Sequence, residues 1–282
     1  MTYDGEPTIR LRRVGIELRR IRESANLTIH EAGRLLDRSP SSMSKVENGQ
    51  VKLWKRELER ILDRYCVTDP VLRDRLATLN ENGRKKGWWL EYSGVADPLL
   101  LDYVSLEAEA EAICSFEPLL IPGLLQTEEY TRAVMSGDPV HGPAELEPFV
   151  ALRMNRQRLL TRGSPPPIHL IVGETALRQV MGSREVMLDQ LELLTELGRL
   201  DYLTLQVLPF SARGPAWFDG PFIILHVQPD HRVVVANHAL GAVYTDLVEE
   251  VDRCTLVFKK LRAVALSTEE SLAFIQRVAG DL

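Results

Sequence analysis

The chain has 282 residues, of which 45% are hydrophobic and 26% are charged. These values are ordinary for globular proteins and exclude a largely disordered chain, and the length suits about two domains. No apolar run reaches the roughly 18 residues that a membrane helix needs, and the first ten residues lack the apolar core of a secretory signal. Cys66, Cys114 and Cys254 form no CxxC pair, so we expect neither a disulfide scaffold nor a cysteine zinc site, and a cytoplasmic protein that does not engage a membrane.

The charge is unevenly distributed along the chain. Residues 1–86 contain 19 Lys and Arg residues against 13 Asp and Glu residues, whereas the remainder contains 15 against 27. A basic N-terminal part joined to an acidic body favours a small anion-binding module, for which nucleic acid is the expected partner, attached to a larger domain with another task.

The basic part is predicted to be helical. Apolar residues recur at spacings of three and four over residues 11–25, which places them on one face of a first helix. Thr28 and Glu31 form a capping box that begins a second helix. A fourth helix is expected to carry Trp54 among its apolar residues, and a fifth begins after Asp69.

The third predicted helix follows a strong start signal. Ser39 can cap the helix, and Pro40 suits the first helical position because its missing N–H costs nothing there. Met43 and Val46 then face inward, and Asn48 followed by glycine ends the helix. Two short helices joined by a tight turn are the helix-turn-helix layout, in which the second helix lies in the major groove of DNA.

The outward face of this third helix suits contact with DNA. Small residues allow a close approach to base edges, Lys45 can reach guanine or a phosphate, and the helix start offers free N–H groups to a phosphate. Lys55 and Arg56 follow nearby for backbone contacts. The predicted DNA-binding residues are Ser39, Pro40, Ser41, Ser44, Lys45, Asn48 and Lys52.

Residues 28–49 resemble the XRE family of Cro/C1-type helix-turn-helix regulators, and the run M-S-K-V-E-N-G within them is similar to that family's usual I-S-R-I-E-N-G. Three positions depart from the pattern. Ile29 stands where the family usually has Gln, Asp37 replaces the turn glycine, and Arg38 replaces an apolar residue. The resemblance implies a five-helix DNA-binding domain, which we place at residues 1–84.

A linker is predicted between the two parts of the chain. Residues 83–87 place two glycines around three cations, which is typical of a break between domains. Trp88 and Trp89 follow at once, and we expect them to join the core of the second domain or to dock the linker onto it. The second domain is predicted to span residues 88–282.

The second domain mixes strands and helices. A strand at residues 168–172, a helix at about 184–199 and a strand at 203–208 predict a βαβ unit with a parallel pair. Two strands that flank residues 228–231 predict a hairpin. The expected fold class is therefore α+β and multi-domain, with an all-α five-helix domain followed by a mixed α/β domain.

Three segments of the second domain, at residues 117–130, 205–210 and 219–222, resemble the C-terminal, DUF5753-type domain of the Scr1-family antitoxin-like regulators, which carry an XRE-type domain in front of it. Members of that family are often encoded beside a small DUF397-type protein. The resemblance thus implies a regulator–partner or toxin–antitoxin pair.

No catalytic constellation is found in the sequence. HExxH, GxSxG, the P-loop and GxGxxG motifs are all missing, so neither an enzyme, a cofactor nor a metal is expected. Three histidines on or beside the predicted hairpin could meet in space, but ordinary strand and turn positions are favoured over a metal site: His226, His231 and His238. Alternating glutamates are expected to form a solvated acidic face rather than a catalytic pair: Glu107, Glu109 and Glu111.

The loop at residues 208–222 follows a predicted parallel strand, where open α/β sheets place their ligand crevices. It can plug the core, bind a partner or line a small-molecule pocket. The candidate partner- or ligand-binding residues are Phe210, Arg213, Trp217, Phe218 and Asp219.

These features together predict a two-domain transcription regulator that binds double-stranded DNA. A homodimer is expected, because one recognition helix reads few base pairs and two half-sites lie one helical turn apart. The second domain is expected to bind a small protein partner. The alternative is a ligand-sensing repressor with a small-molecule pocket behind the loop at residues 208–222.

Overall fold

A computed structural model describes residues 8–84, 87–137, 143–213, 220–228, 231–238 and 241–282. The chain divides into two compact units, Met1–Asp102 and Tyr103–Leu282. The division falls inside helix α6 (Pro98–Glu109), later than the boundary predicted at residues 84–88. No helix in the described ranges is long and apolar enough to cross a membrane.

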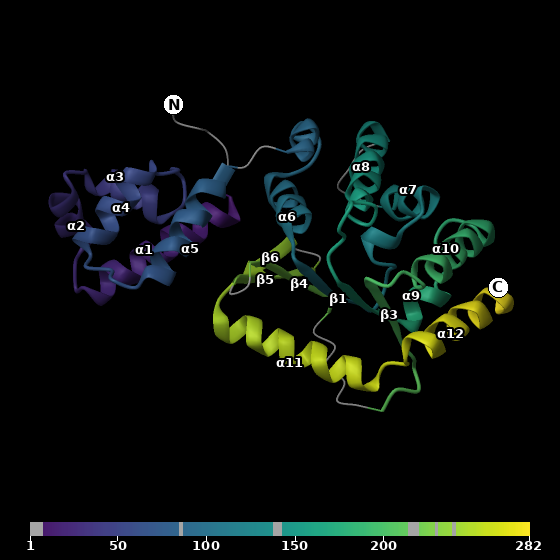
Figure 1. The fold of residues 1–282 in the computed structure, drawn as a ribbon. Coiled ribbons are helices and arrows are strands. Elements are labelled where there is room, and N and C mark those ends of the chain that lie inside the picture. The colour runs from purple at the N-terminus through teal and green to yellow at the C-terminus, as the bar shows by residue number, and fades with distance from the viewer. Residues whose placement is uncertain (1–7, 85–86, 138–142, 214–219, 229–230, 239–240) are drawn as a thin grey trace. The chain divides into compact units, whose positions relative to one another are not determined.

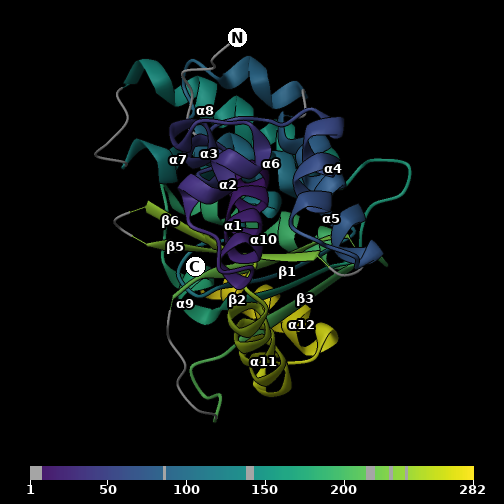
Figure 2. The same cartoon turned by 90° about the vertical axis from the view of Figure 1, so that its left-hand side faces the viewer.

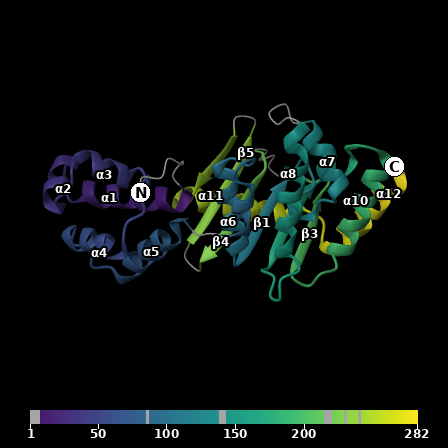
Figure 3. The same cartoon turned by 90° about the horizontal axis from the view of Figure 1, so that it is seen from above.

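The described part of the first unit is helical, as predicted, and its first five α-helices group as one bundle (Figure 3). Its elements before α6 are α1 (Ile9–Ser24), α2 (Ile29–Leu36), α3 (Pro40–Glu47), α4 (Lys55–Arg64), α5 (Pro70–Glu81) and the 3-10 helices η1 (Asn82–Arg84) and η2 (Trp88–Tyr92). The core of the bundle consists of Val14, Leu18, Ala32, Leu36, Met43, Val46, Leu53, Leu58, Ile61, Leu62, Tyr65, Leu76 and Leu79.

The start signals of α2 and α3 are confirmed. The Thr28 side chain accepts from the backbone N–H of Glu31, whose carboxylate accepts in return from the backbone N–H of Thr28, so the capping box is complete. Ser39 Oγ accepts from the backbone N–H of Ser42 at 3.1 Å, and Pro40 occupies the first helical position.

Trp54 stands at the N-cap of α4 and is 80% exposed. The expectation that Trp88 and Trp89 join the core of the second domain is wrong. Trp88 and Trp89 belong to the first unit rather than to the core of the second. Trp89 is buried, and its ring meets that of Trp88 edge to face at a centroid distance of 6.1 Å.

The second unit is built on a six-stranded mixed sheet with the strand order β3-β2-β1-β4-β5-β6 (Figure 1). Its strands are β1 (Ala112–Glu117), β2 (Ile168–Gly173), β3 (Leu203–Leu208), β4 (Phe222–Gln228), β5 (His231–His238) and β6 (Gly241–Thr245). Its helices after α6 are η3 (Gly123–Leu125), α7 (Glu128–Ser136), α8 (Pro143–Arg156), η4 (Gln157–Leu159), α9 (Glu174–Arg178), α10 (Arg184–Leu197), α11 (Val248–Val264) and α12 (Thr268–Asp281).

The predicted βαβ unit and hairpin are both confirmed. β2 and β3 pair in parallel and are connected through α9 and α10, and β4 and β5 pair antiparallel. The central strand β1 and the edge strand β6 were not predicted. β1 pairs in parallel with β2 and antiparallel with β4, so it lies at the point where the sheet changes from parallel to antiparallel.

The two faces of the sheet carry different side chains. On one face, Phe116 packs in a cluster with Phe222 and with Phe258 of α11. Neighbouring residues of a strand point to opposite faces, so Ser115 and Glu117 project from the other face of β1. Figure 2 shows α8 and α10 on one side of the sheet and α11 on the other.

The edge of the sheet formed by β3 is covered by the segment that leads into α12. Leu266 donates its backbone N–H to the carbonyl of Val207, and the backbone N–H of Val207 donates to Ser271 Oγ at 2.9 Å. The capping box predicted for Ser267 and Glu270 is present at the start of α12. β3 is therefore protected from further strand pairing at this point.

Candidate nucleic-acid interface

The turn between α2 and α3 is built around a left-handed residue. Asp37 has φ 54° and ψ 44°, the conformation that glycine usually supplies, and the backbone N–H of Arg38 donates to the carbonyl of Gly33 at 2.8 Å. A Cβ on Gly33 would lie 2.6 Å from the carbonyl oxygen of Arg38, so the chain needs a glycine here for close approach.

Ion pairs hold the two unusual residues of this turn. The Asp37 carboxylate pairs with Arg60 of α4. The Arg38 guanidinium donates to Glu57, also of α4, at 2.6 Å and to Ser42 Oγ at 3.4 Å. The departures from the family pattern at residues 37 and 38 thus tie the turn to α4 while the turn geometry is kept.

The face of α3 predicted to meet DNA is largely accessible. Met43 and Val46 are buried, as predicted, at 0% and 2% exposure. Ser41 and Lys45 are exposed on the opposite side of the helix, and no ion pair or hydrogen bond engages the Lys45 ammonium within the described residues. Of the remaining predicted residues, Ser39 and Asn48 are exposed, and Pro40 and Ser44 are half-buried.

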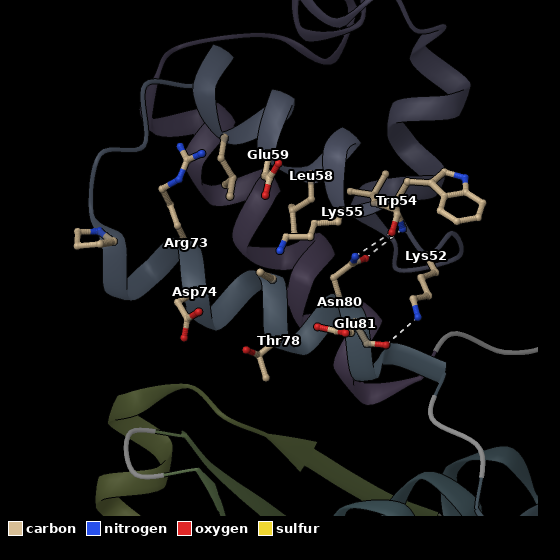
Figure 4. Close-up of a pocket in the computed structure, with 14 residues that line it drawn as sticks. Lys52, Trp54, Lys55, Leu58, Glu59, Arg73, Asp74, Thr78, Asn80 and Glu81 are labelled. Carbon is tan, nitrogen blue, oxygen red and sulfur yellow. Dashed lines mark hydrogen bonds between the residues drawn. The ribbon is translucent and has the colours of Figure 1, made fainter.

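Asn48 and Lys52, both predicted to contact DNA, donate hydrogen bonds within the protein. Asn48 Nδ2 donates to Ser44 Oγ at 3.3 Å, and Asn48 Oδ1 accepts from the Arg19 guanidinium at 2.7 Å. The Lys52 ammonium donates to the carbonyl of Glu81 at the end of α5, at 2.7 Å, and Figure 4 shows it bent toward that oxygen. Both side chains would have to exchange these partners to bind a phosphate or a base.

A buried ion pair that the sequence analysis missed fixes α3 on α1. Glu47 is 2% exposed, and its carboxylate receives two hydrogen bonds from the Arg22 guanidinium, at 2.7 and 3.0 Å. The hydrogen bond from Arg22 to Glu47 raises the pKa of the arginine. A signal was available, because residue 47 lies four positions after Met43 and one after Val46, on the inward face of the helix.

Two glycines allow α1 and α3 to cross at short distance. A Cβ on Gly15 would lie 2.4 Å from the carbonyl oxygen of Glu47. Gly49 has φ +72°, and a Cβ there would lie 2.5 Å from the backbone nitrogen of Arg12. Backbone approaches backbone at both positions, so the placement of α3 on the bundle leaves little freedom.

A groove of about 560 Å³ lies between α4 and α5 (Figure 4). Its apolar lining includes Leu53, Leu58 and Leu62, and charged side chains of both signs surround it. The Asn80 side chain links α5 to the segment before α4, because it donates to the carbonyl of Leu53 and accepts from its backbone N–H. The groove thus combines an apolar floor with a mixed-charge rim.

The candidate loop of the second unit is only partly described. Phe210 is 70% exposed, and its backbone N–H donates to the Glu174 carboxylate at 2.8 Å. Arg213 is exposed as well. The other three candidates, Trp217, Phe218 and Asp219, lie outside the described residues.

The family-like segment at residues 117–130 is organised by buried amides. Gln126 is 2% exposed; it donates to the carbonyl of Ile121 at 2.7 Å and accepts from Thr131 at 3.1 Å. Gln190 of α10 donates to the carbonyl of Leu125 and accepts from the backbone N–H of Thr127, each at 2.7 Å. This segment therefore has a structural task, because it locks the loop after β1 onto α10.

The expectation of a solvated acidic face at residues 107–111 is wrong for its first member. Glu107 is 2% exposed and pairs with Arg156 of α8. On the hairpin, His231 lies 3.2 Å from Asp246, and the His238 side chain is outside the described part of the chain. The described residues contain no group of three or more His, Cys, Asp or Glu side chains arranged to hold a metal.

Comparison with known protein families agrees with the division into a helical part and an α/β part. Residues 13–76 match the model of a helix-turn-helix domain, and residues 100–277 match that of a domain of unknown function, DUF5753. No curated protein and no solved structure matches the chain. The helix-turn-helix match supports a DNA-binding regulator. The chain belongs to the DUF5753 family and carries a helix-turn-helix domain ahead of the family's defining domain.

Proposed function

We propose that the chain is a sequence-specific transcription regulator that reads the major groove of double-stranded DNA with α3. The observation that carries the proposal is the outer face of α3, where Ser41 and Lys45 are exposed while Met43 and Val46 anchor the helix. A Lys side chain on such a face can reach guanine, and small neighbours permit close approach.

Phosphate contacts would fix the register of the protein on the duplex. The exposed cations that follow α3 are Lys55 and Arg56 at the start of α4, and the N-terminus of α3 adds free backbone N–H groups. Replacing one phosphate-binding cation would lower affinity for all sequences alike and reduce the slope of log K against log salt by about one.

The DNA-binding test begins by selecting a binding site from random double-stranded DNA with the full-length protein. The selected site is then titrated at several salt concentrations. We also propose that the chain binds DNA as a homodimer, and we therefore expect a defined sequence made of two half-sites about 10 base pairs apart. Recovery of no preferred sequence would contradict sequence-specific reading.

We further propose that the second unit binds a small DUF397-type protein. The support is the family membership together with an exposed surface at Phe210 and Arg213. Native mass spectrometry of the tagged protein from its own cells tests this, with an added mass of one small protein as the expected result. A bare homodimer would contradict a constitutive complex.

A variant pair locates the partner surface. Phe210→Ser should reduce co-purification of the small protein if this loop forms the contact. Leu256→Ser is the matched control, since Leu256 is an exposed apolar residue on α11 at 54% exposure. If both variants lost the co-purified small protein to the same extent, neither Phe210 nor Leu256 could be identified as the contact.

A further inference from the structure

Polar and charged side chains gather near the carboxyl end of β1 in the second unit. Ser115 and Glu117 project from the face of β1 opposite to Phe116, and α6 and α8 send Glu107 and Arg156 to the same region. In open α/β sheets, ligands bind at the carboxyl ends of the strands.

One half of this cluster is fully partnered. The Arg156 guanidinium donates to both carboxylate oxygens of Glu107, at 2.7 and 2.9 Å, and to the Tyr103 hydroxyl at 3.1 Å. The Tyr103 hydroxyl donates in turn to Glu107. All three side chains are buried, and the two charges neutralise each other.

The other half of the cluster lacks partners. Ser115 is 3% exposed, and its hydroxyl has no hydrogen-bond partner in the described structure. The Glu117 carboxylate likewise accepts no hydrogen bond and forms no ion pair there. The Arg153 guanidinium makes one long hydrogen bond, 3.4 Å from Nη1 to Gln126 Oε1. Of these groups, the Ser115 hydroxyl is buried without a partner, which destabilises a fold. The half-buried Glu117 carboxylate and Arg153 guanidinium can still reach water, and a ligand that replaced this water could pair with all three groups.

The pKa values of Glu117 and Arg153 agree with two charged groups that do not pair with each other. Burial raises the pKa of Glu117 to about 7, although the guanidinium groups of Arg153 and Arg156 act in the opposite direction. Burial, together with the neighbouring charge of Arg156, lowers the pKa of Arg153 to about 10. The carboxylate and the guanidinium feel each other's charge without making contact.

The Arg153 side chain is held in place before any ligand arrives. It lies across Gly123 of the family-like loop, where a Cβ would be 2.5 Å from Arg153 Nη1. Gln126, which accepts its one hydrogen bond, is itself fixed by Ile121 and Thr131. Arg153 and Glu117 are half-buried, so part of each remains in reach of solvent.

We propose that this end of β1 binds a small zwitterion of the amino-acid type, with its carboxylate on Arg153 and its ammonium group on Glu117. The Ser115 hydroxyl offers a further hydrogen bond to either group. A ligand with one charge would pair with only one of these two half-buried groups, whereas a zwitterion pairs with both. This site lies in the second unit and does not depend on the proposed binding of DNA or of a small protein.

The test uses the full-length protein and each of the twenty standard amino acids as probes. At about 100 times Kd, the bound ligand is expected to raise the Tm of the second unit by about 5 °C. Acetate and methylammonium at the same concentration carry one charge each and should leave Tm unchanged. Isothermal calorimetry then measures the Kd of the amino acid that gives the largest shift.

Variants separate this site from other binding surfaces. Glu117→Gln and Arg153→Gln should each weaken the binding at least about tenfold, because each removes one charge-assisted hydrogen bond to the ligand. Arg158→Gln is the matched control, because Arg158 is an exposed arginine only two residues beyond Arg156. If Arg153→Gln fails to fold, the isosteric Glu117→Gln variant still decides the question.

Proton release provides a readout that a structural role would not produce. An ammonium group on Glu117 lowers the pKa of that carboxyl, so binding near pH 7 should release protons and the heat should vary with the buffer. Glu117→Gln should abolish this variation. The proposal is overturned if no amino acid binds, if acetate binds equally well, or if the variants bind like the original protein.

Discussion

Arg22–Glu47 in the first unit and Arg156–Glu107 in the second are buried pairs of nearly the same geometry. The first has N–O distances of 2.7 and 3.0 Å, the second 2.7 and 2.9 Å. Their surroundings differ. Arg22 uses a further N–H on the carbonyl of Leu27, and Glu47 receives Arg19 as well, whereas the second pair adjoins Arg153, which has a single long hydrogen bond.

This difference separates a structural pair from one beside a candidate site. In the first unit, the pair completes its own hydrogen bonds and leaves the outer face of α3 exposed. In the second unit, the pair neutralises two charges while Arg153, Glu117 and Ser115 remain without adequate partners among the described residues. A buried ion pair therefore does not by itself indicate a ligand-binding site. Neighbouring polar side chains that lack partners within the protein do indicate one.

The largest effect is expected from breaking the pair of the second unit. Arg156→Leu leaves the Glu107 carboxylate buried without a counterion and should lower the free energy of unfolding by about 3–5 kcal/mol. Urea denaturation monitored by a probe in the second unit measures it. The double variant Glu107→Leu/Arg156→Leu should regain much of the loss, and no recovery would contradict a pairwise role.

The pair of the first unit should give a smaller loss of stability with a functional consequence. Glu47→Leu removes the buried counterion of Arg22 and should cost about 3 kcal/mol, because Arg22 keeps a weaker ion pair with the exposed Glu23. Since α3 is then less firmly held on α1, affinity for the selected DNA site should fall as well. Unchanged stability would show that the pair does not anchor α3.

The pH dependence of stability should distinguish the second cluster from the first. The pKa of Glu117 is raised from 4.5 to about 7 in the folded chain. The protonated carboxyl therefore stabilises the fold fully below pH 4.5, and this stabilisation is lost as the pH rises through 7. We expect the free energy of unfolding to fall by about 3 kcal/mol over this window. Glu117→Gln should remove that part of the slope, and identical slopes in both proteins would contradict the raised pKa.

The smallest expected effect concerns the cap of α3. Ser39→Ala removes the acceptor of the Ser42 backbone N–H and should cost about 1 kcal/mol of stability. Thermal unfolding of the first unit measures it, with Ser41→Ala on the exposed face as the control. A cost in the control equal to that of Ser39→Ala would argue against a capping role.

Local signals in the sequence predicted the first unit well. The starts of α2 and α3 depend on side chains within three residues of the capped backbone, so Thr28 and Ser39 could be assigned directly. The βαβ unit was also readable, because a buried strand, a long amphipathic helix and a second buried strand follow one another. The match to a helix-turn-helix domain agrees with that assignment.

The features that were missed depend on partners distant in the chain. Glu47 meets Arg22 across 25 residues, and Glu107 meets Arg156 across 49. β1 is short and contains Cys114 and Ser115, so it becomes a central strand only through its pairing with β2 and β4. Tertiary pairing of this kind leaves no periodic signal in the segment itself.

Titration of the selected DNA site with the original protein and with Lys45→Ala tests the central claim most directly. If α3 reads the major groove, the substitution should weaken specific binding by about 1–3 kcal/mol and relax the preference at one base position. Lys259→Ala, which removes an exposed charge from α11, is the control and should bind as the original protein does. Equal affinity and equal sequence preference for the Lys45→Ala variant and the original protein would contradict the assignment of α3 as the recognition helix.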